Sequence, residues 1–167
     1  GSNPAVKDAL ADGLTRERWF EITGDEVANL TGNRARFLRE PNERIHVPGI
    51  HENVDGDNVG TRYRGAITAP VSGDYTFWIS GDDEAELWLA DGSIQKNLYG
   101  VATSLSNRYG KQRLAQVKDE RFGIDYTAES DFDRFATQRS RAVTLVAGHS
   151  YYFEVLHKEG GGSAHVS

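Results

Sequence analysis

The sequence has no cysteine among its 167 residues, which excludes disulfide bridges and metal sites built from thiolates. It also has no run of about 18 apolar residues, so we expect no segment that inserts into a membrane. Basic residues are in the minority, since 19 lysines and arginines face 25 acidic residues and leave a net charge of −6. A nucleic-acid partner would need a basic face, so this balance favours a cation or a neutral ligand instead.

Sequence signatures of catalysis are also missing. The chain contains no G-x-S-x-G elbow, no P-loop and no G-x-G-x-x-G run, and its histidines lack the spacing of a zinc site. Asp55-Gly56-Asp57 begins like a calcium-binding EF-hand loop. However, Val59 and Ala66 stand at positions five and twelve, where that loop needs oxygen ligands. This segment is therefore predicted to be a polar turn.

Short β-rich runs make up most of what the sequence does contain. They are separated by Gly, Asp and Pro turn signals and predict strands at 16–22, 62–69, 75–80, 84–89, 142–146 and 151–157. The turn at 71–74 is predicted to join the second and third of these strands as a hairpin. This pattern indicates an all-β sandwich or barrel in residues 14–167, after a flexible lead-in at 1–13. The length fits one domain with a sizeable core.

A polar stretch at 99–141 interrupts the strand pattern, and we interpret it as a long excursion over the surface. Residues 107–120 are compatible with one or two helical turns. Tyr99, Tyr109 and Tyr126 lie in the excursion and are the aromatic residues best placed to line a binding site. The three tryptophans fall in predicted strands and are expected to pack inside the sandwich: Trp19, Trp78 and Trp88.

Two consecutive carboxylates, Asp82 and Asp83, follow Gly81 in the connection between two aromatic-rich strands. An acidic turn is one interpretation, because Asp is common in turns. Adjacent carboxylates repel each other, however, and a hard cation that takes six to eight oxygen ligands would use both. Neighbouring side chains of an extended chain point to opposite faces. Both carboxylates therefore reach one ion only if the backbone between them is distorted, for example by a cis peptide bond.

Several runs, taken in order, make the chain resemble the PA-fourteen domain family, named after anthrax protective antigen. The resemblance covers about residues 14–166 and rests on these runs: Tyr63-Arg64-Gly65, Gly73-Asp74-Tyr75-Thr76-Phe77-Trp78-Ile79, Gly81-Asp82-Asp83-Glu84-Ala85-Glu86-Leu87-Trp88-Leu89, Leu145-Val146-Ala147-Gly148-His149-Ser150-Tyr151-Tyr152 and His157-Lys158-Glu159-Gly160-Gly161-Gly162. With it, the predicted fold is an antiparallel β-sandwich with a long surface excursion between the central and C-terminal strands.

The resemblance implies a calcium ion held by two consecutive aspartates that are joined by a cis peptide, with vicinal hydroxyls of a sugar bound to the ion. Asp82 and Asp83 match these aspartates. The loop at 159–163 matches the second calcium-binding loop of the family, which makes Glu159, Gly160 and Gly161 the remaining candidate ligands.

One residue of that second loop departs from the family pattern. Many bacterial members carry Asp or Asn near the position of Ser163 or Ala164, and this chain has neither there. Glu159 is the substitute that the sequence offers.

We therefore predict a non-enzymatic, calcium-dependent, lectin-like module of a larger secreted or surface protein. Its partner is a carbohydrate, bound by Asp82, Asp83, Tyr99, Tyr109 and Tyr126. Its expected location is extracellular, at the cell surface or periplasmic. Two alternatives stay open: a structural or protein-interaction module of the same fold without a working sugar site, favoured by the missing acid, and an accessory domain of a polysaccharide-degrading enzyme.

Overall fold

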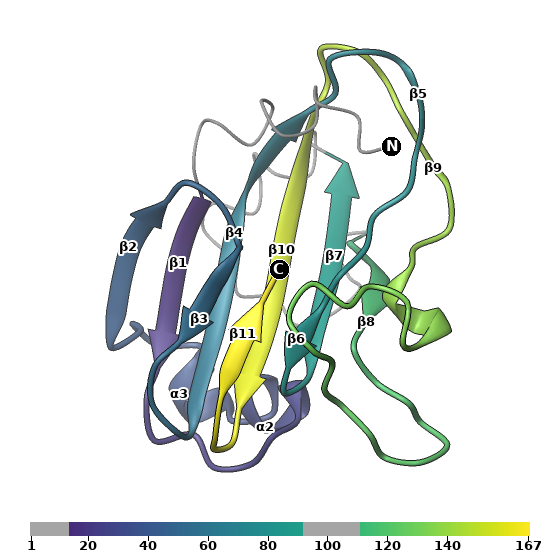
Figure 1. The fold of residues 1–167 in the computed structure, drawn as a ribbon. Coiled ribbons are helices and arrows are strands. Elements are labelled where there is room, and N and C mark those ends of the chain that lie inside the picture. The colour runs from purple at the N-terminus through teal and green to yellow at the C-terminus, as the bar shows by residue number, and fades with distance from the viewer. Residues whose placement is uncertain (1–13, 92–110) are drawn as a thin grey trace.

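Six antiparallel strands form the larger sheet, in the order β2-β1-β4-β10-β7-β8 (Figure 1). The computed structural model describes residues 14–91 and 111–167. The strands of this sheet are β1 (Leu14–Trp19), β2 (Glu43–Val47), β4 (Val59–Thr68), β7 (Ala85–Asp91), β8 (Gln112–Gln116) and β10 (Ser150–Glu159).

A second layer covers one face of this sheet (Figure 1). It contains a three-stranded sheet in the order β3-β11-β6 and the strand pair β5-β9. The bounds are β3 (Glu52–Val54), β5 (Gly73–Tyr75), β6 (Gly81–Asp82), β9 (Val143–Leu145) and β11 (Ala164–Val166). The main hydrophobic core includes Phe153 and Val155 of β10, which alternate along the strand as the period of two requires. The predicted all-β antiparallel sandwich is confirmed.

The helices cover the opposite face of the larger sheet. They are α2 (Val27–Thr31) and α3 (Arg34–Phe37), both short. The 3₁₀ turn η2 (Ala136–Gln138) lies instead beside Ile79 of the main core, whose N–H donates to the Gln138 carbonyl oxygen at 3.1 Å. Trp19, Leu30 and Leu156 form part of a second core on that face. Gly60 of β4 allows the close approach, because a Cβ there would lie 2.5 Å from Leu30 Cδ1. None of the helices in the described residues has the length and apolar character needed to cross a membrane.

The predicted hairpin at 71–74 is wrong. β4 pairs with β1 and β10, whereas β5 crosses to the other layer and pairs with β9. The alternation in 75–80 is nevertheless correct, since Tyr75, Phe77 and Ile79 all pack in the main core. A period of two specifies the buried face of a strand but not its partner, and Pro70 ends β4 before a tight hairpin can form.

Three further expectations had different outcomes. Trp19 is buried as predicted and Trp88 packs against the second core, but Trp78 is 48% exposed, with the Arg139 guanidinium 5.7 Å from its ring centre. The helical turns expected within 107–120 are wrong for 112–116, which form edge strand β8. The helices α2 and α3 were not predicted, because segments of four or five residues give too little periodicity to detect.

A buried carboxylate organises the outer face of β1 and β4. Glu17 is fully buried and accepts hydrogen bonds from Arg44 Nε at 3.0 Å, Arg62 Nε at 2.7 Å and Arg64 Nη2 at 2.9 Å. Burial alone would raise the pKa of Glu17, but attraction by Arg62 and Arg64 and the hydrogen bonds outweigh it and lower that pKa. Its ion pairs therefore stabilise the fold above the usual carboxyl range and are lost as the pH falls through the lowered pKa.

Replacing Glu17 by Gln should lower the free energy of unfolding at pH 7 by about 3–5 kcal/mol, because the buried Arg62 loses its counter-charge. Denaturant titration at pH 7 measures this loss, and the difference from wild type should shrink below about pH 4. Glu40→Gln is the control, since Glu40 is 83% exposed and pairs only with Arg44 among the described residues. Its effect should stay within about 1 kcal/mol. Equal effects of the two substitutions would contradict a structural role for Glu17.

Candidate functional site

Connections between strands meet at one end of the sandwich (Figure 1). Asp82 ends β6, Asp83 follows it, and Glu159 ends β10. Pairing of β10 with β4 and β7 fixes Glu159, while β6 pairs with β11 through Asp82 and His165. The peptide bond between Asp82 and Asp83 is cis, as the family resemblance implied. Segments far apart in the sequence therefore bring three carboxylates close together.

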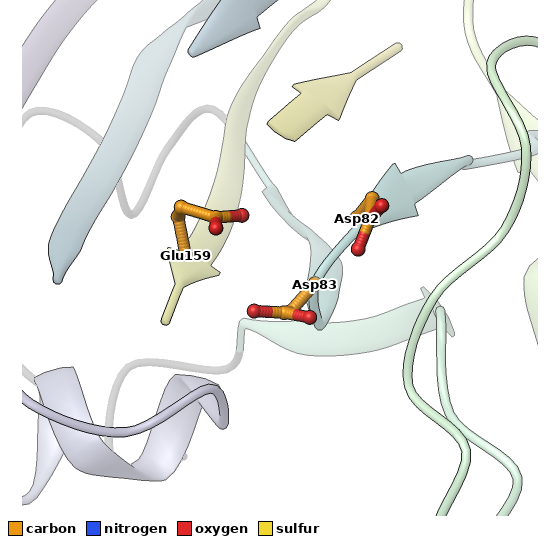
Figure 2. Close-up of side chains that lie close together, drawn as sticks. All are labelled: Asp82, Asp83 and Glu159. Carbon is orange, nitrogen blue, oxygen red and sulfur yellow. The ribbon is translucent and has the colours of Figure 1, made fainter. Parts of the chain in front are cut away.

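The carboxyl groups of Asp82, Asp83 and Glu159 turn toward one shared space (Figure 2). Each offers an oxygen atom, and these oxygens all lie within 4.8 Å of one another. Glu159 is 1% exposed, and neither of its carboxylate oxygens has a hydrogen-bond partner of normal geometry among the described residues. A buried carboxylate without partners is costly unless a cation compensates it. A donor set made only of oxygens suits a hard cation such as calcium.

Backbone and imidazole groups hold the two aspartates. The N–H of Gly160 donates to Asp83 Oδ2 at 2.9 Å, and His157 Nε2 donates to the Asp82 carbonyl oxygen at 2.9 Å. Glycine is needed at 160, because a Cβ there would lie 3.3 Å from Asp83 Oδ2 and 3.3 Å from Asp25 Cβ. The loop after β10 therefore packs directly against the carboxylates.

A buried lysine lies beside the acidic cluster. Lys158 is fully buried, and its Nζ donates to the carbonyl oxygens of Gly24 and of Glu159, the latter at 2.7 Å. Burial lowers the pKa of Lys158, and attraction by Glu159, Asp83 and Asp25 opposes that change. The ammonium group thus provides part of the positive charge that the carboxylates require.

Burial and mutual repulsion raise the pKa values of carboxyl groups in this cluster. Burial, then repulsion from Asp83, raises the pKa of Asp82 to about 6. Burial, followed by repulsion from Asp83 and Asp82, raises the pKa of Glu159 to about 7. Asp125 belongs to the same acidic region, since burial and repulsion from Asp25 and Asp83 raise its pKa to about 6. A bound cation would oppose these shifts, because its positive charge favours the ionised carboxylates.

Sequence reasoning did not find Asp25, Asp125 and Lys158. No local pattern marks Asp25 or Asp125, which reach the site from loops distant in the sequence. Lys158 stands in a run quoted for the family resemblance, but a lysine before an acid normally suggests exposed charge. Its burial becomes clear only in the folded structure, where its Nζ donates to the carbonyl oxygens of Gly24 and Glu159.

The other predicted site residues are placed differently. Gly161 lies beside Asp57, whose Cγ would be 3.6 Å from an added Cβ. Tyr126 is 46% exposed, and the Arg134 guanidinium carbon lies 4.5 Å from its ring centre. Tyr99 and Tyr109 fall outside the described residues. A role for any of the three tyrosines in sugar binding stays a prediction.

Comparisons with known proteins agree with this geometry. The family model described as PA14 domain matches residues 49–167. The chain is 32% identical over 144 residues to the mouse N-acetyl-beta-glucosaminyl-glycoprotein 4-beta-N-acetylgalactosaminyltransferase 1, and this alignment covers 86% of the chain but only 12% of the mouse protein.

Among solved structures, the fold is similar to the epithelial adhesin 9 A domain of Candida glabrata in complex with Galβ1-3GlcNAc. The TM-score is 0.60 at 11% identity, over 92% of this chain and 79% of the adhesin domain. An anti-sigma factor domain-containing protein from Clostridium clariflavum gives a TM-score of 0.54 at 22% identity, over 92% of this chain and 40% of that one. At these identities the likeness concerns the fold alone.

The raised pKa of Glu159 predicts how Glu159→Gln changes the stability of the fold when a chelator keeps calcium away. At pH 7.5 the ionised carboxylate costs the folded state free energy, so Glu159→Gln should be more stable than wild type, on the order of 2 kcal/mol. As the pH falls through the folded pKa of about 7 toward 5, the wild-type carboxyl becomes protonated and the difference should close. Thermal unfolding of both proteins across this range measures it.

Glu120→Gln is the matched control, because Glu120 is solvent-exposed. Its unfolding temperature should follow wild type at every pH. A Glu159→Gln variant that is less stable than wild type at pH 7.5 in chelator would contradict the predicted cost of the ionised carboxylate.

Proposed function

The chain belongs to the PA14 domain family, and on that premise we propose that it is a calcium-dependent carbohydrate-binding module without catalytic activity of its own. The observation that supports this most directly is the convergence of Asp82, Asp83 and Glu159, with the buried Glu159 carboxylate lacking any partner of normal geometry among the described residues. Such a cluster destabilises the fold when no ligand neutralises it, and a bound cation would offset that cost.

In this proposal Asp82, Asp83 and Glu159 supply the side-chain oxygens for calcium, and Gly160 and Gly161 supply backbone oxygens. When bound, calcium provides open coordination positions for two vicinal hydroxyls of a sugar. The chain itself does the positioning. His157 fixes the Asp82 carbonyl, and the Gly160 N–H fixes the Asp83 carboxylate.

The nature of the glycan is suggested by the relatives. The structurally similar adhesin 9 A domain forms complexes with Galβ1-3GlcNAc and with Galβ1-4GlcNAc. The mouse relative is named as a transferase that acts on glycoprotein glycans, and this chain spans about an eighth of it. We therefore propose uncharged galactosyl-GlcNAc disaccharides as first ligands.

A shallow calcium-mediated site binds one sugar weakly, with a Kd of about 1 mM, which corresponds to about −4 kcal/mol. Useful attachment would come from several modules on one larger protein at the cell surface or outside the cell. A second candidate role is that of an accessory module attached to a carbohydrate-active enzyme, which the glycosyltransferase relative favours. Both roles use the same sugar site and differ only in the attached domains.

Calcium should raise the unfolding temperature of the wild type relative to chelator. A ligand that binds only the native state stabilises it by about 2.7 kcal/mol at one hundred times Kd. Asp83→Asn should lose this gain, although the amide oxygen can still accept the Gly160 N–H. Gly160→Ala should weaken calcium binding about tenfold, because its Cβ displaces the loop from Asp83.

Gly49→Ala is the control for the added methyl group, since a Cβ there would meet no atom within 4 Å and Gly49 is not part of the proposed calcium site. Isothermal titration with calcium after exhaustive chelation gives the affinities. A wild type that does not respond to calcium would rule out the calcium mechanism and favour a structural or protein-interaction module.

Sugar binding should depend on the same ion. A glycan array probed with wild type should retain Galβ1-3GlcNAc or Galβ1-4GlcNAc in calcium and lose them in chelator, and Asp83→Asn should bind neither. Magnesium alone should not restore binding, because magnesium keeps a rigid six-coordinate shell and its waters. Binding that survives chelator would overturn the role of calcium, while calcium binding without any glycan on the array would overturn the lectin function.

A further inference from the structure

A cleft of about 440 Å³ lies at the same end of the sandwich as the three carboxylates. One wall comes from the segment that leaves β1 and includes Phe20 and Glu21. The other comes from the β3–β4 loop and includes Asp55, Asp57 and Asn58. Both segments run along the end of the sandwich that also carries the β10–β11 loop (Figure 1). From the sequence, 55–57 were predicted to form a polar turn.

Hydrogen bonds make the cleft continuous with the proposed calcium site. Asn58 N donates to the Gly160 carbonyl oxygen at 3.1 Å, and Gly160 N donates to Asp83 Oδ2 at 2.9 Å. On its other side, the Asn58 carbonyl oxygen accepts the N–H of Ile22 at 2.8 Å, which joins the two walls. Gly162 N also donates to Asp57 Oδ1 at 3.4 Å. One backbone network thus positions both the carboxylates and the cleft.

The lining of the cleft combines an aromatic surface with hydrogen-bond acceptors. Phe20 is 39% exposed, so part of its ring is open to solvent beside the acidic side chains of the cleft. A pyranose has C–H faces that pack on aromatic rings and hydroxyls that donate to carboxylates, so this combination matches a sugar residue. Glu21, Asp55 and Asp57 make the cleft acidic, and no lysine or arginine is among the described residues that line it, although Arg36 donates to the Phe20 carbonyl oxygen at 3.0 Å behind one wall.

We infer that this cleft is a second subsite, which holds the sugar residue next to the calcium-bound one in an uncharged glycan. The inference rests on the proposed function, because the first residue is anchored at Asp82 and Asp83. Three carboxylates at the subsite repel sialic and uronic acids and accept hydroxyl protons from neutral sugars. Specificity for neutral chains thus follows from the charge of the cleft.

Other exposed aromatic residues near this end are less available. The Arg134 guanidinium carbon lies 4.5 Å from the centre of the Tyr126 ring, and that of Arg121 lies 5.0 Å from the Phe122 ring centre. Each of these rings already has one face occupied by an arginine of its own loop. A positive guanidinium there would also attract anionic sugars, contrary to the acidic cleft.

The test compares Galβ1-3GlcNAc with methyl β-galactoside by calorimetry in saturating calcium. Phe20→Ala should weaken binding of the disaccharide about 3- to 10-fold and leave binding of the monosaccharide unchanged. Phe20→Trp, which keeps an aromatic ring, should retain disaccharide affinity. Ile45→Ala is the matched control, since Ile45 is 40% exposed on edge strand β2 and lines no part of the cleft. It should bind both sugars like wild type.

Charge selectivity gives an independent readout. On the array, Asp55→Asn should increase the ratio of sialylated to neutral glycans bound about 3-fold, because it removes one of three repelling charges. An unchanged ratio, or a Phe20→Ala variant that binds Galβ1-3GlcNAc like wild type, would overturn the subsite. Loss of both sugars in Phe20→Ala would overturn it too, because it would indicate damage to the primary site.

These failures are distinct from failure of the proposed function. If wild type shows no calcium-induced rise in unfolding temperature, or binds neither sugar in calcium, the primary site is wrong and the subsite falls with it. If calcium and methyl β-galactoside bind normally and only the Phe20 and Asp55 effects are absent, the lectin function stands and the subsite alone is rejected.

Discussion

The arrangement of the molecule depends on the double pairing of β10. This strand hydrogen-bonds to β4 along all ten of its residues and to β7 over most of them, so neither its register nor its direction can shift without breaking the larger sheet. Phe153 and Val155 pack in the main core on one face of the strand, and Leu156 packs in the second core beneath the helices on the other face. Glu159 is the last residue of this rigid element. Its carboxylate is therefore presented to Asp82 and Asp83 by the most constrained part of the fold.

Three carboxylates brought together at the end of a sandwich would repel each other, and the fold limits that cost by several means. Lys158 places an ammonium group beside them, and the Gly160 N–H donates to the Asp83 carboxylate. His157 donates to the backbone carbonyl oxygen of Asp82 and so holds the chain in place there. Residual repulsion remains, as the raised pKa of Glu159, about 7, indicates. An interaction that the fold does not satisfy internally is a common mark of a binding site. Under the proposed function, the three carboxylates lower the stability of the fold at this end and in return form the binding site.

Much of the fold and the centre of the site could be predicted from the sequence, and the limits have physical reasons. Consecutive aspartates between two β-rich runs indicated a cation site, because repulsion between adjacent carboxylates has no structural benefit. The alternation of Tyr75, Phe77 and Ile79 correctly gave the buried face. Strand partners, however, are decided by long-range packing, so the expected hairpin was wrong. Asp25, Asp125 and the cleft around Phe20 arise from contacts between distant loops, which leave no local pattern.

The buried ammonium group of Lys158 has a further consequence for when the module becomes active. Because this charge is part of the polypeptide, it offsets some of the carboxylate repulsion whatever ions the surroundings contain. The chain can then reach its folded state where calcium is scarce, with its carboxylates already in position. Under the proposed function, the supply of calcium would then control whether the folded module binds its glycan, and not whether the module folds. Adhesion would begin on arrival in a calcium-rich medium and would reverse, without unfolding, when the ion is withdrawn.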